Sequence, residues 1–202
     1  AGEEIRDLSD SEFDIFNAVL EKALSEGALG LSSGLGYVLS RWVSYSEIKR
    51  ILSVVATHKK VYATHLRNEK DNLISSTKET LKIAEETGVT TIISHLRPII
   101  GFEEQFLQAF SLIEEKLNKG NIYFDINPFN ESIIPIYNLL PIWAQHGNFE
   151  AMLDTIGDSK YRQRILNDLA ESKEKVDEVV IIGAKDNEYI LGKTLREFSE
   201  DR

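Results

Sequence analysis

The sequence predicts an α/β fold in which parallel strands alternate with helices. Short apolar runs rich in β-branched residues, such as "VTTIIS" from Val89, lack the polar alternation of a strand with one face in water. Such runs are typical of parallel sheets that are covered on both faces. Segments with helical periodicity separate them, which is the pattern of repeated βα units. The strands are expected to start at Ala28, Val61, Val89 and Ile122.

This spacing of roughly 30 residues approaches that of a TIM-type barrel, in which about 250 residues make eight units. Four units form only half of such a barrel. We therefore expect a partial (βα) barrel of parallel strands with its helices outside.

Helix boundaries can also be predicted from the sequence. Ser9 and Glu12 have the spacing of a capping box, and Gly27 supplies a stop after the first helix. A second helix is expected to open at Ser44, with Glu47 again three residues on. Two further helices are expected over residues 72–87 and 102–118, closed by Gly88 and Gly120.

The rhythm changes after Asn127. The next stretch, "PFNESIIPIYNLLPIWAQHGNFEAML", holds three of the four prolines and no obvious strand. Short helices are expected over residues 148–155, 160–171 and 193–198, with the apolar run "EVVIIG" before the last of them. We therefore predict barrel units over residues 1–127 and a mainly helical insertion over residues 128–202 that continues the same domain.

Composition excludes several classes of function. The net charge of −10 and the pI of about 5.0 argue against a nucleic-acid or anionic-membrane partner. The chain has no cysteine, so any metal must be held by His, Asp or Glu. No apolar run has the length of a membrane span, and the N-terminal stretch is acidic where a signal peptide would be basic. We expect a soluble, cytoplasmic protein.

Two of the four histidines recur at matching points of successive units. His65 ends the run "VYATH" and His95 ends "TTIISH", and Leu and Arg follow each of them. Carboxyl ends of parallel strands meet at one edge of a sheet, where ligands bind. The pairing favours a shared zinc site over two hydrogen-bonded strand-end residues, the commoner role of a lone histidine. His58 and His146 are expected to be structural.

A zinc site usually needs three protein ligands. Asp125, at the end of "IYFDI", is the best candidate for the third, although such an Asp can instead cap a loop. Glu69 could hold Arg67. Arg67 and Arg97 could grip a substrate carboxylate through bidentate hydrogen bonds, or form surface ion pairs.

Six motifs then connect the chain to a known family: "EGALGLSSGLGY", "VYATHLRNE", "TTIISHLR", "YFDINPF", "LLPIWAQHG" and "YILGKTLREFSE". In this order they resemble the N-acyl-D-amino-acid deacylases, or D-aminoacylases, of the amidohydrolase superfamily. The resemblance extends from about residue 5 to residue 202. It implies a distorted (βα)8 barrel in which histidines of the fifth and sixth strands, matching His65 and His95, bind zinc.

The resemblance further implies that Tyr37, Arg67 and Arg97 face the substrate, with Arg97 at a position that is more usually Lys. It implies one or two zinc ions in a complete enzyme and metal-assisted hydrolysis of the amide bond of an N-acyl-D-amino acid. The family's His-x-His pair and Ser-Asp-Gly motif are absent from the sequence, so no catalytic residue is assigned within it. In addition, "NPF" at residues 127–129 replaces the usual "YPY", and "YVLS" replaces "YPPG".

We therefore expect these 202 residues to be the central segment of a longer polypeptide, inactive alone. The alternative is a non-catalytic half-barrel that serves as a binding or interaction module, but a scaffold has no need for both histidines with their arginines. A nucleotide-binding doubly wound sheet is weakly supported, because "GALGLSSG" lacks the glycine fingerprint and the P-loop lysine. Half a barrel leaves two sheet edges open, so self-association is expected.

Overall fold

The computed structural model describes residues 6–38, 40–117, 121–129, 131–145, 147, 149–171 and 176–201. The chain forms two compact units, Ala1–Ser132 and Ile133–Arg202. Whether residues 128–202 continue the domain of residues 1–127 stays a prediction. Of the helices in the described part of the chain, none combines the length and apolarity needed to span a bilayer.

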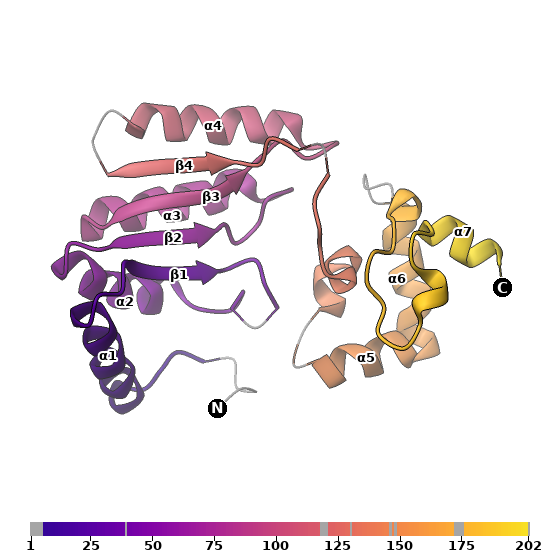
Figure 1. Ribbon diagram of the computed structural model, residues 1–202, viewed down its shortest axis with the longest axis horizontal. Coiled ribbons are helices and arrows are strands. Elements are labelled where there is room, and N and C mark those ends of the chain that lie inside the picture. The colour runs from indigo at the N-terminus through magenta and orange to yellow at the C-terminus, as the bar shows by residue number, and fades with distance from the viewer. Residues whose placement is uncertain are drawn as a thin grey trace. The chain divides into compact units, whose positions relative to one another are not determined.

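A four-stranded parallel sheet is the centre of the first unit, and its strands pair in chain order. They are β1 (Gly30–Gly34), β2 (Val61–His65), β3 (Thr90–Leu96) and β4 (Ile122–Ile126). Right-handed crossovers in one direction place the connecting helices on the same face of a sheet, and Figure 1 shows α2 and α3 behind the strands. These helices are α2 (Tyr45–Thr57), α3 (Leu73–Thr87) and α4 (Glu103–Leu117). The predicted α/β class is confirmed.

The predicted helix signals form as capping structures. The side chain of Ser9 accepts a hydrogen bond from the N–H of Glu12 at the start of α1 (Asp10–Ser25), and the capping box is complete. The side chain of Ser44 caps α2 in the same way. Gly88 ends α3 with a φ of 72°, which glycine adopts without a Cβ clash. The predicted stop at Gly120 lies outside the described residues.

The first strand starts later than predicted. The backbone N–H of Ala28 donates to the carbonyl of Ala23, so Ala28 takes part in capping the C-terminal end of α1 and is not yet in the strand. Pairing with β2 begins at Gly30, which lies opposite Val61. In the described part of the chain β1 and β4 form the sheet edges, and self-association through them stays a prediction.

The core of the first unit lies between the sheet and its helices. Leu52 and Val55 of α2 and Ile93 of β3 are fully buried. Ile113 of α4 belongs to the same apolar cluster as Ile93. This packing fixes which residues of β2 and β3 face the helices, and it leaves the strand ends to carry polar side chains.

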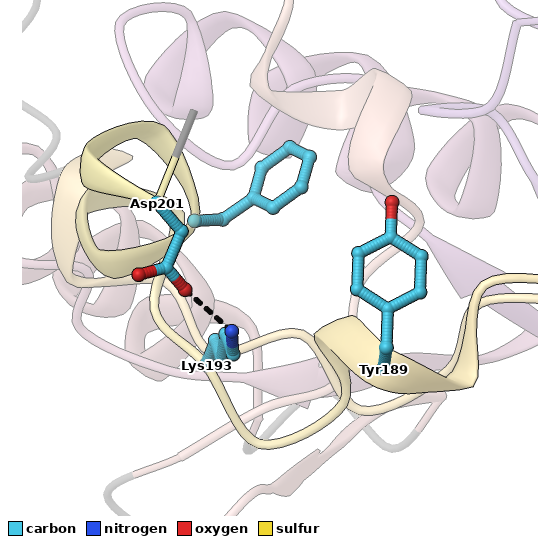
Figure 2. A pocket seen from close by; sticks show the side chains of 4 residues that line it. Tyr189, Lys193 and Asp201 are labelled. Carbon is cyan, nitrogen blue, oxygen red and sulfur yellow. Dashed lines mark hydrogen bonds and ion pairs between the residues drawn. The ribbon is translucent and has the colours of Figure 1, made fainter.

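The second unit is mainly helical, as predicted for this part of the sequence. It contains α5 (Phe149–Gly157), α6 (Ser159–Glu171) and α7 (Leu195–Glu200), together with short 3-10 helices. The run "EVVIIG" forms no strand of the sheet and makes one antiparallel bridge, between Val180 and Thr194. A cavity of about 370 Å³ is lined by Tyr189, Lys193, Phe198 and Asp201. Figure 2 shows Lys193 paired with Asp201 beside it.

Candidate metal site

The two recurring histidines lie together at the carboxyl edge of the sheet. His65 is the last residue of β2, and His95 is the last but one of β3. Nδ1 of His65 and Nε2 of His95 are 2.8 Å apart, and the ring centroids are separated by 4.5 Å. Adjacent parallel strands therefore bring two imidazole nitrogens to one point.

The backbone of His95 has an unusual conformation. Its φ of 44° is in the left-handed region, and the register of β3 against β4 shifts between Ile93 and Leu96. Such a conformation costs about 1–3 kcal/mol in a residue other than glycine. Oδ1 of Asp125 accepts a hydrogen bond from the His95 backbone N–H at 2.5 Å and so holds this conformation. Asp125 takes the loop-holding role that was its alternative to a metal ligand.

Glu69 is the third member of the cluster. One donor atom each from His65, Glu69 and His95 lies within 4.8 Å of the others. Oε1 of Glu69 is 3.1 Å from Nδ1 of His95 and 3.8 Å from Nδ1 of His65. The sequence reasoning missed this role, although an acidic residue four positions after a strand-end histidine is a usable signal.

The suggestion that Glu69 holds Arg67 is wrong. Nε and Nη2 of Arg67 each donate to the carboxylate of Glu79 at 2.9 Å, and Nη1 donates to the carbonyl of Arg41. Glu79 lies in α3, so this ion pair links the loop after β2 to that helix. Arg67 is thus held within the protein rather than left available for a ligand.

Arg97 differs from Arg67. Its Nε is buried without a hydrogen-bond partner, an arrangement that carries a free-energy cost unless a further group completes it. The charge of Arg97 also contributes to the electrostatics of both His65 and Glu69. Of the two predicted substrate-binding arginines, the structure leaves unused hydrogen-bonding capacity on Arg97.

Tyr37 and the glycine-rich turn lie against His65. The rings of Tyr37 and His65 stack with centroids 5.0 Å apart and planes 17° apart. A Cβ on Gly36 would lie 2.7 Å from Nε2 of His65, so only glycine allows the turn to approach this ring. The turn therefore packs against the imidazole of His65 and restricts its orientation. The contact of Tyr37 with substrate stays a prediction.

The charge state of the cluster suits metal binding. Burial, followed by the nearby charges of His95 and Arg97, lowers the pKa of His65 to about 4. Burial raises the pKa of Glu69, against the opposing effects of His95, Arg97 and Lys70. A histidine must be neutral to bind a metal ion, and His65 is neutral at pH 7. Two imidazoles with a nearby carboxylate are a donor set that zinc accepts.

The remaining histidines behave differently. His58 is the C-terminal cap of α2, away from the cluster. His146 lies outside the described residues.

Substitution of Asp125 by alanine should affect both folding and the site. Loss of the acceptor for the His95 N–H is expected to lower the free energy of unfolding by about 1 kcal/mol, because the bond is exposed. Zinc affinity should fall by about tenfold, because the His95 ring loses its backbone support. Urea denaturation and chelator competition measure the two effects. Asp125→Asn keeps an acceptor oxygen and should recover most of both, and equal losses in the Asn and Ala variants would contradict this role.

The curated proteins that this chain resembles include deacylases of N-acyl-D-amino acids. No protein-family profile matches the chain. A D-aminoacylase of Alcaligenes xylosoxydans xylosoxydans is 28% identical over 61% of this chain and 26% of its own length. An N-acyl-D-glutamate deacylase of the same organism is 32% identical over 38% of this chain and 16% of its own length. The chain therefore spans about a quarter or less of the length of these curated relatives.

The solved structures that this chain resembles include the same two kinds of deacylase. A D-aminoacylase with a binuclear metal center is 28% identical over 61% of this chain and 26% of its own, with a TM-score of 0.57. An N-acyl-D-glutamate deacylase of Bordetella bronchiseptica, complexed with zinc and a phosphonate inhibitor, matches 97% of this chain and 35% of its own at a TM-score of 0.70. Its identity is 21%, so it supports the fold alone.

The parallel βα sheet with a histidine pair at its carboxyl edge is thus found in a chain that is similar to amidohydrolases, the class that the solved D-aminoacylase structure defines. The relatives it matches are N-acyl-D-amino-acid deacylases, the family that the six motifs resemble, and the matches cover a segment of those longer proteins.

Proposed function

We propose that this chain is part of a metal-dependent hydrolase that cleaves the amide bond of N-acyl-D-amino acids. The observation that carries the proposal is the contact between Nδ1 of His65 and Nε2 of His95 at the carboxyl edge of the sheet. The similarity to D-aminoacylases supports the same chemistry. Water would add to the amide carbon, and the C–N bond would break to give a carboxylate and a free amino acid.

His65 and His95 would hold Zn²⁺ through the two facing nitrogens. A bound ion supplies polarisation of the amide carbonyl and a water of lowered pKa. The chain's own task is to orient the two imidazoles. Tyr37 supports the His65 ring by stacking, and Asp125 supports the His95 backbone.

Substrate binding would rest mainly on Arg97. Its unsatisfied Nε is the group that a substrate carboxylate would complete, and a guanidinium can bind a carboxylate through two parallel hydrogen bonds. Arg67 would act indirectly, by joining the loop after β2 to Glu79 of α3. No residue of this segment is proposed as the proton-transfer group.

Zinc binding tests the proposal directly. The chain should bind one Zn²⁺, and the His65→Ala/His95→Ala double variant should bind it more than about 100-fold more weakly, beyond the effect of losing a supporting group. Competition with a coloured chelator measures the affinity after metal removal.

His58→Ala is the matched control, because this histidine caps α2 outside the cluster. It should bind zinc as the unsubstituted chain does. Equal affinity in the double variant and the unsubstituted chain would overturn the site. A folded chain that binds no zinc would overturn the proposal and favour the non-catalytic binding module.

A further inference from the structure

His95 makes a contact through each of its two ring nitrogens. Nε2 faces Nδ1 of His65 at 2.8 Å, and Nδ1 faces Oε1 of Glu69 at 3.1 Å. The two nitrogens of an imidazole point in diverging directions, so a single ion cannot be bound by both. In a neutral imidazole one nitrogen carries the proton and the other carries the free lone pair. The partner of one nitrogen therefore determines which nitrogen is left for a metal ion.

The burial and position of Glu69 suit it to be that partner. Its side chain is only 16% exposed, and it comes from the loop that follows His65 on the neighbouring strand. A buried carboxylate is costly unless hydrogen-bond donors or positive charges surround it. Nδ1–H of His95 is a donor at the right distance, and Oε1 is farther from Nδ1 of His65, at 3.8 Å.

We propose that Glu69 is a positioning residue rather than a metal ligand: its carboxylate accepts a hydrogen bond from Nδ1–H of His95 and leaves the lone pair of Nε2 directed at the metal position. This inference rests on the proposed metal site. Carboxylates that accept from the second nitrogen of a ligating histidine fix its tautomer and ring orientation. The segment at the end of β2, which supplies His65, thus also sets the orientation of His95 on β3 through Glu69.

Proton positions in the metal-free protein follow from this arrangement. With its proton on Nδ1, His95 offers Nε2 as an acceptor, so Nδ1 of His65 must donate across the 2.8 Å contact. The metal-free chain should therefore contain both histidines with the proton on Nδ1. Metal binding through Nδ1 of His65 would require that ring to carry its proton on Nε2 instead, while the tautomer of His95 stays unchanged.

Nitrogen-15 NMR of the histidine side chains tests the inference without any metal, because the shifts of the two ring nitrogens distinguish the tautomers. The metal-free chain should show His95 with its proton on Nδ1. In Glu69→Ala this preference should be lost, and Glu69→Gln, which keeps an acceptor oxygen, should retain part of it. Zinc affinity of Glu69→Ala should fall by about 10- to 100-fold with one ion still bound.

Glu86→Ala is the control, since Glu86 pairs with Lys49 of α2 instead of a histidine and lies near the end of α3 that is farther along the chain from the loop carrying Glu69. It should leave the His95 tautomer unchanged, which separates a specific effect from general loosening. An unchanged tautomer in Glu69→Ala would overturn the inference. So would a loss of zinc as complete as in the double histidine variant, which would make Glu69 a ligand. A normal tautomer pattern in a chain that binds no zinc would overturn the proposed function and leave the role of Glu69 in orienting His95 intact.

Discussion

Replacement of Gly30 by alanine is expected to lower the free energy of unfolding by at least about 3 kcal/mol, at the upper end of the range for overpacked sites. An added Cβ would lie 1.8 Å from the carbonyl oxygen of Val61, its partner on β2. That oxygen belongs to the backbone of a neighbouring strand, so no side-chain rotation can relieve the clash. Either the pairing of β1 with β2 opens or the whole strand moves outward.

Urea denaturation followed by circular dichroism measures the loss, and hydrogen exchange at Leu31 and Ala63 reports whether the pairing itself opens. Ser32→Ala is the matched control, because Ser32 lies in the same strand with its side chain exposed. It should change the free energy of unfolding by less than about 0.5 kcal/mol. A Gly30→Ala variant as stable as this control would show that β1 does not pair as described.

Replacement of Gly36 by alanine should weaken zinc binding by about 10- to 100-fold, the range for loss of a ligand's support. The new Cβ would lie 2.7 Å from Nε2 and 2.8 Å from Cδ2 of His65, and 3.0 Å from the carbonyl oxygen of Leu66. The ring cannot simply turn away, because Tyr37 stacks on it and His95 contacts its Nδ1. The imidazole must therefore tilt away from the position that it shares with His95.

Chelator competition measures the zinc affinity, and urea denaturation measures the free energy of unfolding of the same variant. Because the clash falls mainly on a side chain, stability should fall by less than in Gly30→Ala. Tyr37→Leu gives the complementary test, since it removes the stacking partner without adding a clash and should partly restore binding in the Gly36→Ala background. Unchanged zinc affinity in Gly36→Ala would show that the His65 ring is free to adapt.

Helix ends could be predicted because their signals are local. Ser9, Ser44 and Gly88 act through hydrogen bonds and dihedral angles within a few residues, and all three end or begin helices where predicted. The apolar runs predicted parallel pairing because both faces of such a sheet are covered. The start of β1 was misjudged because a backbone hydrogen bond ties Ala28 to the C-terminal cap of α1, and side-chain patterns do not show such a bond.

The composition of the site was harder to predict. Strand ends predicted where His65 and His95 would lie, but the partners of charged side chains depend on loop paths. Glu69 and Glu79 are both acidic residues after β2, and the sequence does not tell which one reaches Arg67. The left-handed backbone at His95 was also unpredictable, because its cost is met by Asp125, a residue of another strand.

The alternation of side chains along β3 limits how this chain can change in length just before His95. Side chains of a strand alternate between faces, so one residue inserted or deleted between Thr90 and Ile93 would turn His95 toward the opposite side of the sheet. The amino ends of the strands have no such restriction. Insertions near the turn at Gly88 would lengthen the connection into β3 while leaving the paired residues in place. Among related sequences, length differences should therefore collect at the amino ends of the strands and be absent from the few residues that precede each histidine.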